Sequence, residues 1–159
     1  MKRRLFLSLP IGVTLFVSFA CAKKEDSWAV IESVQEHLFP KSTKYPSAKS
    51  FQALRYLKMV SHHDSFDKED LDFIQQGARE LEKRGYKSIM IKSEKEQMLR
   101  EFSKSQFGKN WISLLLNYTL EAMLSDPLYG GNKDEKGWRA YKHHAGVPRP
   151  TKRFGERHG

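Results

Sequence analysis

Two histidine pairs are the first candidates for chemistry in this chain, because imidazole binds metal ions and exchanges protons near neutral pH. The pairs are His62-His63 and His143-His144. Adjacent residues on a helix point about 100° apart, and neither pair has a carboxylate or a third histidine at the spacing of a ligand set. We therefore interpret both pairs as solvated loop residues, and the sequence predicts no metal site.

Other reactive groups also lack the neighbours that catalysis needs. Ser125 is followed by Asp126, but no recognisable base accompanies them, and helix capping is the usual role of such residues. Gly130-Gly131 follows a predicted helix and lacks the glycine spacing of a dinucleotide site. The sequence has no CxxCH motif for haem attachment. We predict no catalytic residue and no cofactor on this chain.

A long apolar helix, predicted over Trp111 to Leu124, is the element around which the chain is organised. Its apolar residues cover every face, which is typical of a helix inside a bundle. Polar residues interrupt it too often for a membrane span, which needs about 20 mostly apolar residues. Pro127 restricts the backbone before it, so we expect the helix to end near Ser125.

A tight reversal is predicted directly after this helix. Gly130, Gly131 and Asn132 all tolerate a positive φ. Tyr129 and Trp138 stand on either side of the reversal, and each carries a polar atom that needs a partner when buried. Two interpretations stay open. The stretch either forms a rigid corner that folds the C-terminal segment onto the core, or it presents its rings to a partner.

The same stretch resembles a known family signature. The segment Asp126-Pro127-Leu128-Tyr129-Gly130-Gly131-Asn132, followed by Gly137-Trp138, resembles the C-terminal signature of gluconate 2-dehydrogenase subunit 3. Trp111 and Leu120-Glu121-Ala122 are similar to the family's preceding helix, and the resemblance extends loosely from about Trp28 to Gly146. After Trp138 the family usually shows an apolar stretch, whereas residues 141–148 here are more polar.

This resemblance implies a non-catalytic small subunit of a periplasmic, membrane-associated dehydrogenase that oxidises a sugar or sugar acid. A large subunit of the glucose–methanol–choline type would carry FAD, and a multihaem cytochrome c subunit would pass electrons to the quinone pool. The small subunit would aid folding, export and stability of the flavoprotein. The residues implied in docking are Trp111, Asp126, Pro127, Tyr129, Gly130, Gly131, Asn132, Gly137 and Trp138, with the three aromatic residues as anchors.

Two other functions stay open on the sequence alone. The chain could be a free-standing envelope lipoprotein that acts as an adaptor or binding protein. A small hydrolase or isomerase with an unrecognised site is the third alternative.

The N-terminus reads as an export signal over residues 1–22. Lys2, Arg3 and Arg4 precede an apolar run at 5–20. Arg3-Arg4-Leu5-Phe6-Leu7 resembles a twin-arginine signal, which exports folded proteins through the twin-arginine translocase. An ordinary secretion signal with a chance arginine pair is the alternative. We predict a periplasmic location in association with the cytoplasmic membrane.

Cys21 is the only cysteine, so the domain has no disulfide. The residues before it only half resemble a lipoprotein cleavage box. Lipidation of Cys21, cleavage after Ala22 and an uncleaved anchor therefore all stay open. A single acyl chain binds a membrane weakly, so stable attachment would need a second contact.

The chain carries a formal net charge of +9, with 28 basic and 19 acidic residues among 159. Much of this excess lies from Lys142 onward, in and before a basic tail at 147–159. Nucleic acid is not expected as a partner of an exported protein. The tail either docks on an acidic protein or anionic lipid, or stays solvated and disordered.

Helical periodicity dominates residues 23–146, which we expect to form one domain. The sequence predicts an all-α bundle of about five helices with an irregular C-terminal arm. Besides the helix at 111–124, four helices are predicted. The first runs from Trp28 to before Pro40, and the second is capped by Ser47 and ends near Val60. The third is capped by Asp67 and has Gly85 at its end, and the fourth is opened by a Ser93–Glu96 capping box and ended by Gly108.

Overall fold

Helices form all the regular structure in residues 26–146, the part of the chain that this computed structural model describes. The predicted all-α class is confirmed there. The elements are α1 (Ser27–Leu38), α2 (Ala53–Val60), α3 (Lys68–Lys83), α4 (Lys92–Ser103), α5 (Gln106–Leu124), the 3₁₀ turns η1 (Pro127–Tyr129) and η2 (Lys133–Glu135), and α6 (Lys136–Ala140). The predictions for Arg3, Arg4, Cys21 and the tail at 147–159 lie outside the described residues.

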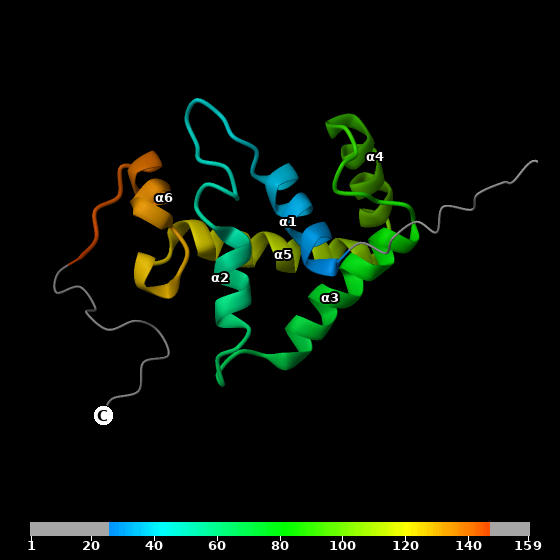
Figure 1. Cartoon of the computed structure of the whole chain (residues 1–159), viewed down its shortest axis with the longest axis horizontal. Helices are drawn as coiled ribbons and strands as arrows, with labels where there is room; N and C mark the ends of the chain where they lie inside the picture. Colours follow the sequence, from blue (N-terminus) through cyan, green and yellow to red (C-terminus); the bar gives the residue numbers. More distant parts are fainter. Residues whose placement is uncertain (1–25, 147–159) are drawn as a thin grey trace, which may run out of the picture.

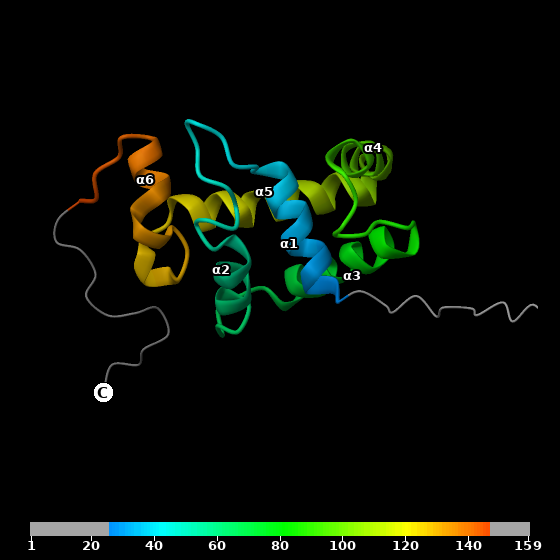
Figure 2. The ribbon, with the colours of Figure 1, turned by 45° about the horizontal axis from the view of Figure 1, so that its top comes forward.

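The long helix α5 is the axis of the fold. It packs against α1, α2, α3, α4 and α6. Figures 1 and 2 show it running along the molecule, with α4 near one end and α6 at the other. Within the described residues, no helix combines the length and the apolar character that a bilayer crossing requires. The position of each other helix is therefore set by the part of α5 that it covers.

Two apolar clusters fill the space around α5. The larger joins α1, α3 and α4 to the first half of α5, and it includes the fully buried Ile31, Ile74, Phe102, Trp111 and Leu115. The smaller joins α2 and the turn before it to the end of α5, through Phe51, Val60, Ala122 and Met123. Burial of this apolar surface is the main stabilising contribution to such a fold.

The expectation that α5 is enclosed on every face is wrong, because one face is open along the helix, with Ser113, Asn117, Glu121 and Leu124 all exposed. Ala122 and Met123 are buried, but the side chain of Leu124 is 46% exposed. No helix of the described residues covers the outward face of this last turn completely. An apolar residue therefore reaches the surface directly before the predicted reversal.

The start of α2 differs from the prediction. The hydroxyl of Ser47 accepts a hydrogen bond from the backbone of Ser50 at 3.3 Å, so it stabilises a separate turn. The helix begins six residues later, after Gln52, which adopts a left-handed backbone with φ 63°. A polar cap followed by helical periodicity could not distinguish this extra turn from the helix itself.

The start of α4, in contrast, is earlier than predicted. The carboxylate of Glu94 accepts a hydrogen bond from the backbone N–H of Ile91 at 3.3 Å, and the helix starts at Lys92. The Ser93–Glu96 capping box is therefore wrong, because both residues already lie inside the helix.

Gly108 does not end a helix but lies in the first turn of α5. The break between α4 and α5 falls at Ser105, whose hydroxyl accepts from the Gly108 N–H at 3.0 Å. A Cβ at Gly108 would lie 2.0 Å from the carbonyl oxygen of Phe102. The glycine is thus explained by a close approach of two backbones rather than by helix termination.

The predicted boundaries of α3 are confirmed. The carboxylate of Asp67 accepts from the N–H of Glu69 at 2.9 Å, which caps the helix start. Gly85 follows the end of the helix with φ +96°, the left-handed conformation that glycine adopts most readily.

Candidate functional site

The end of α5 and the segment 125–141 that follows it, here called the corner, form the candidate site. The last carbonyl groups of a helix have no partner within the helix. Here the corner supplies donors for them. The backbone N–H of Asn132 donates to the carbonyl of Ala122 at 2.5 Å, and the indole Nε1 of Trp138 donates to that of Leu124 at 2.6 Å. The corner is therefore a C-terminal cap for the central helix.

Asn132 is the centre of this cap. Its side chain is fully buried, and both ends of its amide are used. The Nδ2 group donates to the carbonyl of Ser125 at 2.9 Å, while Oδ1 accepts from the N–H of Gly137 at 2.8 Å. Its φ of 44° is left-handed, which asparagine tolerates better than most residues. One amide thus joins the end of α5 to the start of α6.

The first part of the corner is a short 3₁₀ turn, η1. The Asp126 carboxylate accepts from the N–H of Leu128 at 3.0 Å, and Pro127 occupies the first helical position, where its missing N–H costs nothing. Gly130 ends the turn with φ +85°. The predicted reversal is confirmed for Gly130 and Asn132, which both have positive φ, but not for Gly131.

Two glycines of the corner are explained by contact with the α5 backbone. A Cβ at Gly131 would lie 2.4 Å from the carbonyl oxygen of Ala122, and a Cβ at Gly137 would lie 1.9 Å from that of Met123. Real Cβ atoms do not approach a backbone oxygen so closely. Both positions therefore need glycine so that the returning chain can lie directly against the helix end.

The two rings on either side of the reversal pack inward to different degrees. Trp138 is only 7% exposed, and its ring meets that of His143 edge to face, with centroids 5.3 Å apart. Tyr129 is half-buried against the smaller apolar cluster. These contacts favour the rigid-corner interpretation for Trp138, whereas part of Tyr129 remains at the surface.

The structure separates Trp111 from the corner. Trp111 is completely buried near the start of α5, and its Nε1 donates to the carbonyl of Ile74 in α3 at 2.8 Å. A Cβ at Gly77 would lie 2.0 Å from its ring, so α3 and α5 are in close contact there. The expectation that Trp111 is a docking anchor does not fit this burial. Its role is to hold the core.

A surface groove lies beside the corner. It has a volume of about 490 Å³ and is lined by Tyr56, Asn117, Leu120, Glu121, Leu124 and Ser125; we call it the α2–α5 groove. The Tyr56 hydroxyl donates to the Glu121 carboxylate at 3.3 Å. Burial and then the negative charge of Glu121 raise the pKa of Tyr56 to about 12. The Tyr56 hydroxyl therefore keeps its proton near neutral pH and donates it in the hydrogen bond to Glu121.

The sequence did not point to this groove. From the sequence, Leu124 is predicted only to be the last residue of an apolar helix. No sequence motif includes Tyr56. The two residues belong to elements far apart in the chain, and they meet only because α2 packs against the end of α5. A local motif could not reveal this pairing.

The reactive groups considered from the sequence have structural roles. The Asp126 carboxylate caps η1, and His62 Nδ1 lies 2.5 Å from the carbonyl oxygen of Lys58 in its own turn. The Ser125 hydroxyl is buried and has no hydrogen-bond partner in the described part of the chain. Within residues 26–146, no group of three histidine, cysteine or carboxylate side chains is placed to hold a metal ion. The Asp126 carboxylate and the Asn132 amide therefore organise the corner and the surface beside it.

Comparison with known protein families gives one match. A family model described as gluconate 2-dehydrogenase subunit 3 matches residues 25–146, which includes α1 to α6 and the whole corner. Searches of curated proteins and of solved structures found no match.

Proposed function

The chain belongs to the gluconate 2-dehydrogenase subunit 3 family, and from this membership we propose that it is the small, non-catalytic subunit of a membrane-associated, FAD-dependent dehydrogenase. The proposed complex works in the periplasm and oxidises a sugar or sugar acid. FAD belongs to the large subunit, and haem c to a cytochrome subunit that carries the electrons away. This chain contributes a folded body rather than reacting groups.

The observation that carries this proposal is the use of the signature residues inside the corner. Asn132 and Trp138 donate hydrogen bonds to carbonyls at the end of α5. Gly137 donates to the Asn132 side chain, and its Cα lies directly against the Met123 carbonyl. Residues that hold a helix end in this way have a structural role, and they support the surface beside it. The surface they support is the α2–α5 groove, with the exposed Leu124 at its rim.

We propose that the flavoprotein subunit docks on the α2–α5 groove. The groove combines apolar carbons of Leu120 and Leu124 with the fixed hydroxyl of Tyr56. Interface centres of this kind favour aromatic and apolar anchors with a few placed polar groups. A stable subunit contact buries on the order of 2,000 Å² or more, so the groove would be the centre of a larger interface.

Export is the second part of the proposed role. The twin-arginine route carries folded proteins, which suits a flavoprotein that takes up FAD before it crosses the membrane. Arg3 and Arg4 of this chain would then supply the signal for both subunits. Replacing both arginines by lysine should strand the flavoprotein in the cytoplasm together with this chain.

Affinity purification of the tagged full chain from solubilised envelopes tests the proposal. The expected result is a flavin-containing dehydrogenase in stoichiometric amount, with haem absorbance in the same fraction. Recovery of the chain alone, with no flavin or haem, would overturn the proposal and favour a free-standing envelope adaptor. Turnover of a substrate by the purified chain without any partner would also overturn it.

A further inference from the structure

The loop between α3 and α4 exposes two large apolar side chains at the surface. Ile89 is 87% exposed and Ile91 is 64% exposed, the two highest values among the large apolar residues described. Burial of such residues in the fold would have been favourable, yet they point into solvent. Only Met90 separates them, so the three residues form one short apolar stretch that is open to contact from outside the domain.

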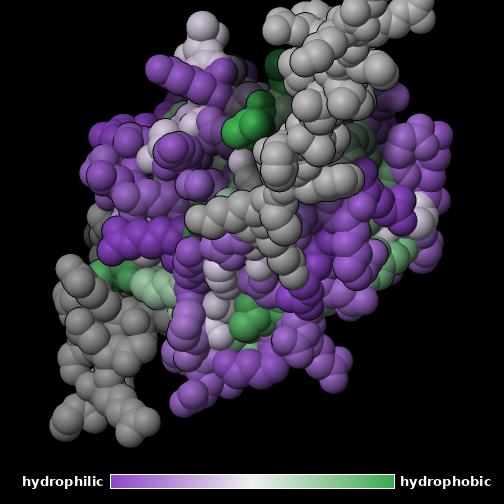
Figure 3. Space-filling view, turned by 45° about the vertical axis from the view of Figure 1, so that its right-hand side comes forward, coloured by the Kyte–Doolittle hydropathy of each residue, from purple (hydrophilic) through white to green (hydrophobic). Residues whose placement is uncertain are grey.

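Lysines surround these isoleucines. Lys87 precedes them, and Lys92 and Lys95 follow on the first turn of α4, with one carboxylate, Glu94, between these two lysines. None of the three has an ion pair with a carboxylate among those found in the described residues. Figure 3 shows the face on this side of the molecule as mainly hydrophilic, with small separate hydrophobic areas. We call residues 87–95 the basic loop.

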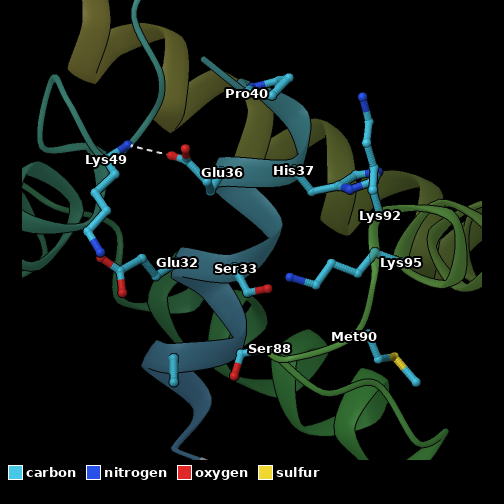
Figure 4. Close-up of a pocket in the computed structure, with 11 residues that line it drawn as sticks. Glu32, Ser33, Glu36, His37, Pro40, Lys49, Ser88, Met90, Lys92 and Lys95 are labelled. Carbon is cyan, nitrogen blue, oxygen red and sulfur yellow. Dashed lines mark hydrogen bonds between the residues drawn. The ribbon is translucent and has the colours of Figure 1, made fainter.

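The basic loop lies beside the beginning of α1. A groove of about 420 Å³ separates them. On the α1 side it is lined by Ala29 and by the carboxylates of Glu32 and Glu36, and on the other side by Ser88, Met90, Lys92 and Lys95. Figure 4 shows Ser88 beside α1, Met90 and Lys92 along the far side of the groove, and the Lys95 side chain extending across it toward Ser33. The described structure begins one residue before α1, so the preceding segment with the apolar run at 5–20 joins the domain near this loop.

We propose that the basic loop is a membrane-contact site that binds anionic phospholipid, with Ile89 and Ile91 entering the headgroup region and the lysines pairing with phosphates. Apolar side chains flanked by lysines are the combination that binds such surfaces. The N-terminal segment, as a retained anchor or through a lipid on Cys21, would bring the same side of the domain to the bilayer. A single acyl chain needs a second contact, and the loop would provide it.

This site lies away from the proposed flavoprotein surface. The basic loop is next to α4, whereas Leu124 and the corner are next to α6, and Figures 1 and 2 place α4 and α6 toward opposite ends of α5. The chain could then contact lipid at one end and its partner at the other. The inference rests on the proposed membrane location and does not require the flavoprotein.

A local probe in the full chain tests the site. Cys21→Ser removes the native thiol, and Ile89→Cys or Tyr141→Cys then carries an environment-sensitive fluorophore. Tyr141 is the matched control, because it is 52% exposed and lies at the end of α6. The probe is measured with vesicles of phosphatidylcholine alone and with vesicles that also contain phosphatidylglycerol. Circular dichroism checks that both variants fold.

The expected result is a blue-shifted emission at residue 89, quenched by brominated lipid, only with the anionic vesicles. The probe at residue 141 should remain in water. Changing Lys92 and Lys95 to glutamine should weaken binding about fivefold for each lysine lost. A probe at 89 that stays in water on anionic vesicles would overturn the site, as would equal insertion of both probes. Shielding of residue 89 only when the flavoprotein is added would assign the loop to a protein interface instead.

Discussion

The indole Nε1 of Trp138 donates to the backbone carbonyl of Leu124 at 2.6 Å, while the Leu124 side chain is 46% exposed beside it. One residue pair thus connects the buried side of the corner with the surface next to it. The ring holds the end of α5, and the leucine that it fixes borders the α2–α5 groove. This division separates the residues that build the surface from those that we propose to contact a partner.

Trp138 is expected to act on stability. Trp138→Ala should lower the free energy of unfolding by about 3–5 kcal/mol, because a nearly buried ring is removed. Trp138→Phe should cost only about 1 kcal/mol, the value of the lost hydrogen bond to Leu124. Urea unfolding of the full chain measures both. Equal stability of Trp138→Ala and the wild type would show that the ring does not hold the corner.

Asn132 allows the hydrogen bonds to be separated from the backbone conformation. Asn132→Gly keeps the positive φ but loses both amide contacts, so we expect a loss of about 2–4 kcal/mol. Asn132→Ala loses the contacts and also strains the backbone, which should cost about 1 kcal/mol more. Thermal unfolding ranks the two variants. If alanine proved no worse than glycine, the left-handed conformation would not be important here.

Gly137 is expected to be the most sensitive glycine of the corner. Gly137→Ala places a Cβ against the Met123 carbonyl, and because backbone cannot move aside cheaply we expect a loss of about 3 kcal/mol or more. Gly85→Ala is the matched control, since its Cβ meets nothing within 4 Å and only the φ of +96° is strained. That control should cost about 1–2 kcal/mol. A smaller loss at Gly137 than at Gly85 would contradict the close packing.

Alkaline pH should destabilise the domain through Tyr56. Its pKa is raised from 10.0 to about 12 by burial and by Glu121. Between these values the unfolded chain releases the proton and the folded chain keeps it, so stability falls as pH rises through this window. The pKa of Tyr118 is also raised, by burial and by its 2.6 Å hydrogen bond to Asp70.

Urea unfolding of the wild type and Tyr56→Phe at about pH 9 and about pH 11 measures the contribution of Tyr56. The variant should lose about 1 kcal/mol less than the wild type between the two conditions, because phenylalanine does not ionise. The same loss in both proteins would show that Tyr56 titrates normally in the fold.

Local patterns predicted the helices well where capping and periodicity agreed. α1 and α3 follow their apolar spacing, and Asp67 and Gly85 mark the ends of α3 as expected. The predictions that Ser47 caps a helix and that Gly108 ends one are wrong. Ser47 instead stabilises a separate turn, and Gly108 allows a close contact between two backbones. Such contacts depend on the residue across the gap, which no local pattern contains.

The candidate site shows the same limit. The reversal after α5 follows from Pro127 and Gly130, which constrain the backbone locally. The burial of Trp111 does not, because its partner Gly77 lies on α3, and the exposure of Leu124 depends on where α2 stops covering α5. The motif identified the family, but only the packing separates its structural residues from the surface they support.

Docking of the flavoprotein on the α2–α5 groove is tested most directly by the amount of flavin that co-purifies with a tagged Leu124→Asp variant. The side chain is 46% exposed, but a carboxylate there would face the negative end of α5 and Glu121, so we expect a folded variant with a stability loss of about 1 kcal/mol. We predict that it loses most of the flavoprotein, because a carboxylate would be buried without a partner in the interface. An unchanged ratio of flavin to chain, in a variant that folds normally, would contradict docking on the α2–α5 groove.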